Sequence, residues 1–503
     1  MAEAFPSFDY EAARSGRALD VADDFNFAFD VVGKRGREKD KTALIAIERT
    51  GETVTHHSYS DLDQLSNRFA NALMTLGAEK GDFAFVMIPR IVEWYQVLLG
   101  CTKTGVVAMP GTNLLTAKDI EYRINRADAR LAIVTAEHAE KVEQIRANCP
   151  SLEHLILIGA ARDGWVTLTD MCAPEADTVD RAALPPTRAD EDMLIYFTSG
   201  TTQMPKMVGR DHAYALAHSI TGDYWMDLRE DDVHWTLTDT GWAKAAWGLL
   251  YPPLLAGAAV VLYDGEGFDP EMHLKIIAEH RVTTFCAPPT IYRVLAQMDL
   301  SGADFSSLRH CFGAGEPLNP EAMRAWKAAT GCDIYDGYGQ TESINIVANF
   351  TGMETRAGPV PRLFPRRRGD GGSVPQRLVL HRRHGDAGCG LLYLVCRPVG
   401  RHHFVRQLSH QPVRGRKRAD RTRSRAGIRR RRQAGRDPRR DRDGLYHAGA
   451  RLRAVGRSGD RNTGFRETAD RPLQIPPRHR IPRRPAEDDI GENPAGGVTG
   501  RGG

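Results

Sequence analysis

The first clear pattern in the chain is a run of apolar residues with the period of a helix. Residues 61–77 place five apolar side chains on one helical face: Leu62, Leu65, Phe69, Leu73 and Leu76. Ser60 and Asp63 are spaced to cap the start of this helix, and Gly77 is suited to end it. The pattern therefore predicts an amphipathic helix with one buried face.

Short apolar runs then alternate with helical patterns. Buried strands are predicted at residues 83–88, 106–110 and 131–135. Helices are predicted around residues 92–105 and from Ala117 onward. Because parallel strands need a crossover connection, usually a helix, this alternation predicts an α/β fold with parallel sheets and flanking helices.

The same alternation returns in the middle of the chain. Asp269 and Pro270 suit the N-cap and the first position of a helix, and residues 282–288 are predicted to form a buried strand. The longest apolar run, residues 247–263, is slightly short for a membrane span, and two adjacent prolines interrupt it. We therefore interpret this run as buried helix and strand, and expect no membrane span.

After about residue 356 this alternation disappears. Residues 1–355 carry 31 Lys and Arg against 51 Asp and Glu, whereas residues 356–503 carry 37 against 13, so their net charges are −20 and +24. In the second region 36 of the 37 cations are Arg, and Pro and Gly are frequent. The sequence therefore predicts a folded region over residues 1–355 and a disordered Arg/Pro/Gly-rich tail over residues 356–503.

The cysteines and the N-terminus bear on the compartment. Eight cysteines are scattered along the chain, with no CxxC pair and no spacing typical of zinc ligands. The N-terminal segment has acidic residues and no continuous apolar stretch, which is unlike a secretory signal. Both observations favour a reduced, cytoplasmic protein.

The stretch YFTSGTTQMPKMV, residues 196–208, is the first candidate for chemistry. After a predicted strand it supplies small hydroxyl residues around a glycine, followed by a lysine: Thr198, Ser199, Gly200, Thr201, Thr202 and Lys206. Backbone N–H groups, hydroxyls and a cation together favour binding of a polyphosphate. The spacing differs from that of a Walker A loop, GxxxxGK[ST].

Three further motifs follow along the chain. They are HWTLTDTGWAKAAWG (residues 234–248), GAGEPLNPE (313–321) and YDGYGQTES (335–343). Together with YFTSGTTQMPK they resemble, in order, the motifs of the acyl-adenylate-forming superfamily, although Gln203 stands where the family usually has glycine. The resemblance covers about residues 20–355. It implies the large N-terminal α/β domain of a short- or medium-chain acyl-CoA synthetase, without the usual small C-terminal domain.

The resemblance implies which residues hold the phosphates and the metal. Those that would hold the pyrophosphate portion of ATP are Thr198, Ser199, Gly200, Thr201, Thr202 and Lys206. Thr341 would hydrogen-bond the α-phosphate, and Glu342 would bind Mg²⁺, a hard cation suited to carboxylate and phosphate oxygen. Lys206, Thr341 and Glu342 would therefore be the catalytic residues.

Other residues would hold adenine and the acid. Tyr338 would stack on adenine, with Gly315, Glu316 and Pro317 along its edge. The remaining nucleotide contacts that the last motif implies are Asp336, Gly337, Gly339 and Gln340. Trp242 and Gly339 would border the acyl pocket, and Trp247 either touches the acyl group or only packs in the core.

The implied reaction explains these residue types. A carboxylate is a poor electrophile, so it first attacks the α-phosphate of ATP, giving acyl-AMP and pyrophosphate, and a thiol then displaces AMP. Catalysis of this kind is mostly positioning and charge neutralisation. The resemblance thus implies an ATP-dependent carboxylic acid–CoA ligase that uses ATP, Mg²⁺ and CoA. The sequence of residues 239–248, DTGWAKAAWG, favours short, medium, branched or aromatic acids over long fatty chains.

Two alternatives stay open. One is an adenylating enzyme with another acceptor, such as a carrier-protein thiol. The other is an inactive protein whose basic residues 414–440 bind nucleic acid, with an affinity that falls steeply with salt. We expect no specific nucleic-acid partner, because translation in a shifted reading frame also explains an Arg-rich tail.

The tail lacks features that the family places after residue 355: a ribose-binding Asp, a hinge to a small domain and a lysine near the end. Read from the second base of each codon, residues 470–481 permit TAPYKYPRDIEF and residues 485–496 permit LPKTISGKIRRV. Both resemble C-terminal motifs of acyl-CoA synthetases. We therefore hypothesise a tail translated out of frame, with a slip between about Arg356 and Gln376, and expect impaired turnover.

Overall fold

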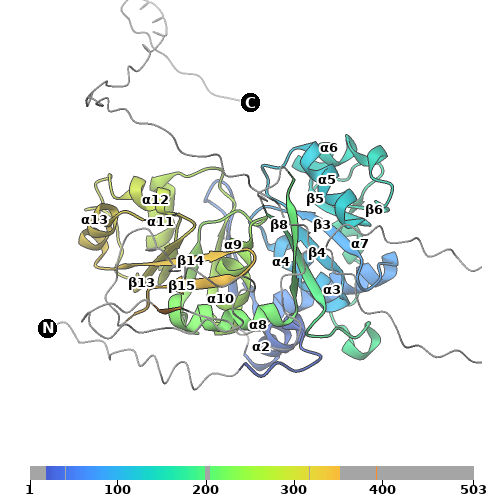
Figure 1. Cartoon of the computed structure of the whole chain (residues 1–503), viewed down its shortest axis with the longest axis horizontal. Coiled ribbons are helices and arrows are strands. Elements are labelled where there is room, and N and C mark those ends of the chain that lie inside the picture. The colour runs from blue at the N-terminus through green and yellow to red at the C-terminus, as the bar shows by residue number, and fades with distance from the viewer. Residues whose placement is uncertain (1–18, 40, 199–203, 317, 352–391, 394–503) are drawn as a thin grey trace, which may run out of the picture. The chain divides into compact units, whose positions relative to one another are not determined.

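The structure is a computed structural model that describes residues 19–39, 41–198, 204–316, 318–351 and 392–393. The chain divides into two compact units, Met1–Arg414 and Gly415–Gly503, and every described residue belongs to the first. Two β-sheets and their helices make up the described part of this unit (Figure 1). Strands and helices alternate along it, which confirms the α/β prediction.

The seven-stranded sheet comes mainly from the earlier part of the chain. Its spatial order is β7 (Val166–Thr167), β6 (His154–Ile158), β5 (Leu131–Thr135), β3 (Phe83–Met87), β4 (Val107–Pro110), β8 (Asp192–Thr198) and β9 (Lys206–Asp211). Neighbouring strands are parallel except β8 and β9, which form an antiparallel edge hairpin. The helices within this part of the chain are α3 (Tyr59–Leu76), α4 (Val92–Thr104), α5 (Ala117–Ala127), α6 (Ala136–Glu143), η2 (Arg146–Asn148), α7 (Leu168–Cys172) and η3 (Arg181–Ala183).

The nine-stranded sheet combines the start of the described chain with its later part. Its order is β16 (Leu392–Tyr393), β15 (Ile344–Ala348), β14 (Ile334–Gln340), β13 (His310–Ala314), β12 (Thr284–Cys286), β10 (Val233–Thr236), β11 (Ala259–Tyr263), β1 (Thr42–Ile47) and β2 (Val54–Ser58). Strands are parallel from β14 to β1 and antiparallel at both edges. The remaining helices are η1 (Ala28–Gly33), α2 (Lys34–Glu38), α8 (Ala213–Ile220), η4 (Thr221–Trp225), α9 (Ala243–Ala245), η5 (Ala246–Leu250), α10 (Tyr251–Ala256), α11 (Pro270–Glu279), α12 (Pro289–Leu295) and α13 (Pro320–Thr330).

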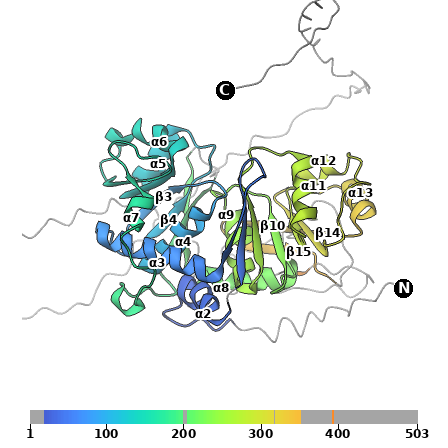
Figure 2. The same cartoon turned by 180° about the vertical axis from the view of Figure 1, so that it is seen from behind.

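Side chains that alternate along the strands explain why both sheets are covered on both faces. In β1, Leu44 faces a core between the sheets that includes α3, α4 and α10, whereas Ile45 faces α11, α12 and α13. In β3, Val86 faces the same central core, whereas Phe85 faces α5 and α6. Successive strand side chains point to opposite faces, so helices pack on each side of each sheet (Figures 1 and 2).

The start of α3 differs from its prediction. The N-cap is Ser58, whose side chain accepts a hydrogen bond from the backbone N–H of Asp61. The carboxylate of Asp61 accepts one from the backbone N–H of Ser58, which completes the capping box. Asp63 instead accepts a hydrogen bond from the buried Lys103 at 2.7 Å. The pattern Ser-x-x-Asp occurs twice, at Ser58–Asp61 and at Ser60–Asp63. Because Asp63 is engaged by Lys103, the first pair forms the cap. The predicted end at Gly77 is confirmed, since Gly77 is the C-cap with φ of 83°.

Other predicted elements are confirmed. β5 spans the predicted residues 131–135, and α11 begins after Asp269 with Pro270 in its first turn. The apolar run 247–263 forms η5, α10 and β11. Among the helices that the structure describes, none has the length and apolar character needed to cross a membrane.

Candidate active site

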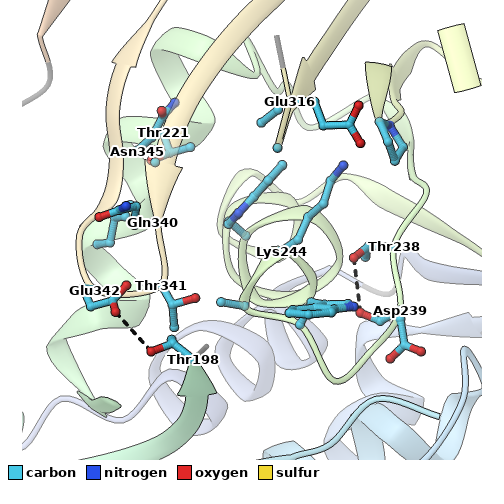
Figure 3. Close-up of a pocket in the computed structure, with 18 of the residues that line it drawn as sticks. Thr198, Thr221, Thr238, Asp239, Lys244, Glu316, Gln340, Thr341, Glu342 and Asn345 are labelled. Carbon is cyan, nitrogen blue, oxygen red and sulfur yellow. Dashed lines mark hydrogen bonds between the residues drawn. The ribbon is translucent and has the colours of Figure 1, made fainter. Parts of the chain in front are cut away.

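A cavity of about 810 Å³ lies where strands of both sheets end. Its walls include residues that end or closely follow β8, β10, β12, β13 and β14: Thr198, Thr238, Pro288, Ala314 and Gln340. Ligands of open α/β sheets bind in the crevice outside the carboxyl ends of the strands. This cavity is therefore the candidate active site (Figure 3).

The predicted phosphate loop joins the two strands of the edge hairpin. Thr198 ends β8 and lines the cavity, and Lys206, the first residue of β9, pairs with Thr198 across the ladder. Lys206 is not among the described residues that line the cavity. The loop positions that lie outside the described residues are Ser199, Gly200, Thr201, Thr202 and Gln203. The structure thus places both ends of the loop at or beside the cavity.

The motif YDGYGQTES forms most of β14 and the turn that follows it. The backbone N–H of Ser343 donates to the carbonyl of Gln340 at 3.0 Å, and the N–H of Gln340 donates to Ser343 Oγ at 3.2 Å. This closed turn brings Gly339, Gln340, Thr341 and Glu342 to the cavity wall, as the sequence predicts for a single site.

Two hydrogen bonds tie this turn to the seven-stranded sheet. Thr198 Oγ1 donates to Glu342 Oε1 at 3.2 Å, and the guanidinium of Arg210, on β9, donates to the carbonyl oxygen of Thr341. The guanidinium carbon of Arg210 also lies 5.1 Å from the ring centroid of Tyr214, which lines the cavity. The turn is therefore fixed by residues of both sheets. Arg210 was not predicted from the motifs.

The motif HWTLTDTGWAKAAWG supplies another wall. The carboxylate of Asp239 accepts hydrogen bonds from the N–H of Gly241 at 2.8 Å and from the N–H of Asn113 at 3.2 Å. Gly241 packs backbone to backbone against residues 111–112, where an added Cβ would lie 2.1 Å from backbone atoms. Trp242 follows; it is 54% exposed and lines the cavity, and its contact with the acyl group stays a prediction.

Trp247 and Lys244 form the inner part of the same wall. Trp247 packs on Trp225, with ring centroids 5.2 Å apart, and both rings line the cavity. Lys244 Nζ lies 5.6 Å from the Trp247 ring, is buried, and has no hydrogen-bond partner among the described residues. No role was predicted for Lys244, although a single cation within an apolar run could have marked it.

Asn345 is a second polar residue that the motifs did not indicate. It is the second residue of β15, lines the cavity and is 6% exposed. Neither its amide nitrogen nor its amide oxygen has a partner among the described residues. Tyr214 and Thr221, at the start of α8 and of η4, also line the cavity, and no motif covers them.

The predicted adenine loop lies at the end of β13. Gly315 and Glu316 line the cavity, and the carboxylate of Glu316 pairs with Arg293 at 3.0 Å. Pro317 lies outside the described residues. The described part of this loop is therefore placed as the motif predicts, although its contacts with a nucleotide stay predictions.

The three residues before Gly339 are not among the cavity lining of the described chain. Tyr338 is 37% exposed, and Gly337 packs against the ring of Trp225, where an added Cβ would lie 2.5 Å from the ring. Burial raises the pKa of Asp336 to about 7, opposed by a backbone hydrogen bond at Gly337. Their predicted adenine contacts stay predictions.

With this geometry in view, residues 33–367 match the family described as AMP-binding enzyme. The match spans well over half of the chain and includes every motif that reaches the cavity. The chain belongs to this family. The predicted membership of the acyl-adenylate-forming superfamily is therefore confirmed.

Relatives of this AMP-binding enzyme are acyl-CoA synthetases by name. The mitochondrial acyl-coenzyme A synthetase ACSM3 of Mus musculus is 38% identical over 369 residues, which cover 71% of this chain and 62% of that protein. The human mitochondrial acyl-coenzyme A synthetase ACSM4 is 39% identical over 363 residues, covering 70% and 61%. The chain thus spans less than two thirds of the length of these relatives.

Solved structures confirm the predicted fold class. The crystal structure of the anthranilate CoA ligase AuaEII in complex with anthranoyl-AMP matches with a TM-score of 0.62 at 30% identity, covering 67% of this chain and 64% of that one. An acyl-CoA synthetase of Brucella canis matches with a TM-score of 0.60 at 27% identity, covering 70% and 64%.

The relatives overturn the predicted compartment. The relatives ACSM3 and ACSM4 are mitochondrial by name, which contradicts the cytoplasmic prediction. Unpaired cysteines, of which six lie among the described residues, report the redox state of a compartment and not its identity. They therefore could not have distinguished between reducing compartments.

Proposed function

We propose that this chain carries the adenylation site of an acid–thiol ligase, which joins a carboxylic acid to coenzyme A with ATP. The observation that carries the proposal is the convergence of all four motifs on one cavity, from both sheets. Further support comes from the relatives, which are named as acyl-coenzyme A synthetases.

In the proposed first step, a carboxylate oxygen of the acid forms a bond to the α-phosphorus of ATP. The bond between that phosphorus and the β-bridging oxygen breaks, and pyrophosphate leaves with the electron pair. In the second step, the sulfur of coenzyme A attacks the acyl carbon of the mixed anhydride, loses its proton, and AMP leaves. Both steps depend on aligned reactants and on stabilisation of negative charge.

The hydroxyls of Thr198 and Thr341 are the donors we propose for phosphoryl oxygens. Both side chains lie at the cavity, and the turn that carries Thr341 is held by Arg210 and closed by Ser343. Lys206 would add positive charge beside them, across the ladder from Thr198. On the adenine side we propose Gly315 and Tyr338.

Glu342 is the residue we propose for Mg²⁺. Its carboxylate lies at the cavity, within hydrogen-bond distance of the Thr198 hydroxyl, so it offers hard oxygen where phosphate is expected. The described residues contain no group of three or more acidic, His or Cys side chains that would hold a metal alone. One carboxylate fits, because Mg²⁺ at such sites is bound mainly by substrate phosphates and water. Bound there, the ion would neutralise charge on the phosphates.

We further propose that residues 1–355 form the adenylation domain and that residues 356–503 are translated out of frame. The support is the change in charge and composition at that point, and the shifted codons described above. Resequencing the gene tests this proposal. A single undisturbed frame through residue 376 would contradict it.

ATP–pyrophosphate exchange with a panel of carboxylic acids tests the activity, in the chain as it stands and in a frame-corrected chain. In the corrected chain, Lys206→Met and Glu342→Gln should each lower exchange by about 10² to 10³. Lys327→Met, which removes an exposed cation paired with Asp333, is the matched control and should leave exchange unchanged. Unaltered exchange in both site variants would refute their roles, and thioester formed only with a carrier-protein thiol would favour the other acceptor.

A further inference from the structure

The cavity contains a polar side chain that the fold itself leaves unsatisfied. Asn345 is 6% exposed, and neither atom of its amide has a hydrogen-bond partner among the described residues. Buried polar groups in native proteins are nearly always paired, so each exception calls for an explanation. Since Asn345 lines the candidate active site, a bound molecule is the natural partner.

The backbone around Asn345 is built to place it there. The pairing of β14 with β15 shifts register between Tyr338 and Gly339, and Gly339 then pairs with Asn345. The preceding residue, Ile344, has φ of 63°, which a β-branched residue rarely adopts because its Cβ crowds the backbone. A register shift re-aims side chains. A left-handed residue and a bulge are common in hairpin connections, and in this hairpin they place Asn345 at the cavity wall.

The surroundings define which chemistry would satisfy the amide. The cavity lining includes the aromatic side chains of Trp225, Trp247 and Tyr214. Its polar members include Thr221 and Lys244 (Figure 3). An amide offers donors and an acceptor at once, and a hydroxyl or a carboxamide matches both. A hydrocarbon chain or an unsubstituted ring would leave both amide atoms without water and without a partner.

We propose that Asn345 selects acids whose acyl portion carries a neutral hydrogen-bonding substituent, a hydroxyl or a carboxamide. This inference rests on the proposed function, because it places the acyl portion in this cavity. Asn345 acts here as a specificity-determining residue. A site built to hydrogen-bond a substituent discriminates strongly against the analogue that lacks it, since its buried polar group is then left unpaired.

Calorimetry with acyl-sulfamoyl-adenosines, which mimic acyl-AMP without reacting, tests this in the full chain without requiring turnover. Benzoyl, phenylacetyl and hexanoyl probes are each compared with derivatives that carry one hydroxyl or one carboxamide. At least one substituted probe should bind more tightly than its parent. Asn345→Leu, which keeps the volume and removes the hydrogen bonds, should reduce that ratio by about 10- to 100-fold, mainly by weakening the substituted probe.

Asn125→Leu makes the same chemical change on α5, at an exposed residue away from the cavity, and should leave the ratio unchanged. Parent probes that still bind Asn345→Leu show that the variant is folded. If substituted and parent probes bind the wild type equally, or if Asn345→Leu leaves their ratio unaltered, the inference is overturned while the proposed function stands. Failure of every probe to bind the wild type overturns the proposed function itself.

Discussion

The interface of α3 with α4 and the wall of the cavity each bury the amine of a lysine, and the two amines have opposite surroundings. Lys103 Nζ donates to Asp63 Oδ1 at 2.7 Å, to Ser66 Oγ at 2.8 Å and to Asn67 Oδ1 at 2.5 Å. Lys244 Nζ has no hydrogen-bond partner among the described residues and lies 5.6 Å from the Trp247 ring. A buried cation that the fold pairs belongs to the structure, whereas one left unpaired beside a cavity is available to a ligand.

The largest expected difference is in stability. Lys103→Met should lower the free energy of unfolding by about 3 to 5 kcal/mol, because it leaves the Asp63 carboxylate, 19% exposed, without its partner. Lys244→Met should change it by less than about 1 kcal/mol, since no bond within the fold is lost. Urea denaturation of both variants measures the difference. Equal losses would mean that Lys244 is a structural residue and that the distinction between the two regions is wrong.

The next effect is a pH dependence of stability near neutrality, caused by Asp336 in the strand that leads to the cavity. Burial raises the pKa of Asp336 to about 7, above the unfolded value near 3.8. The folded protein therefore binds more protons between those values, so this group's contribution to stability is full below about pH 4 and is lost as pH rises through 7. Asp336→Asn should remove this dependence and stabilise the protein at pH 8 by up to about 4 kcal/mol. Thermal unfolding at pH 5 and pH 8 checks it; identical pH slopes in both proteins would contradict it.

Arg210 belongs to both groups: it is paired within the fold, and its partner is the turn that lines the cavity. Its guanidinium holds the carbonyl of Thr341, so Arg210→Gln should release the turn and weaken ATP binding by about tenfold. Arg210→Lys keeps a donor and should recover part of that loss. Calorimetric titration with ATP and Mg²⁺ measures both variants. A purely structural role would lower stability in both and leave the affinity of the folded fraction unchanged.

The smallest stability effect is expected at Trp242. This ring is 54% exposed although it lines the cavity, so Trp242→Ala should change the free energy of unfolding by less than about 0.5 kcal/mol. Trp225, 1% exposed and packed on Phe312, provides the contrast, and Trp225→Ala should cost about 3 to 5 kcal/mol. A large loss at Trp242 in the same urea experiment would place it in the core.

Elements set by local chemistry could be predicted from the sequence. The apolar run of β5 and the Asp–Pro start of α11 are found where they were expected, because their determinants lie within a few residues. The cap of α3 could not be located, because Ser58–Asp61 and Ser60–Asp63 are equivalent until Lys103, on another helix, engages Asp63.

The site divides in the same way. Thr341 and Glu342 belong to one short motif, so their shared position followed from the sequence. Arg210 and Asn345 lie outside the motifs that were given roles. Asn345 lines the cavity and Arg210 bonds the Thr341 carbonyl in the cavity wall because an edge hairpin from each sheet meets there. No motif in the sequence indicates that these two hairpins lie side by side.

The bare contact of Gly241 with residues 111–112 has a consequence for how substrate preference can change. Main chain touches main chain there, so the gap between these two loops is fixed by peptide geometry and not by any side chain. Replacing Trp242 or Lys244 nearby can therefore change the shape of the cavity without moving these backbone segments. Any residue larger than glycine at 241 would push the two segments apart.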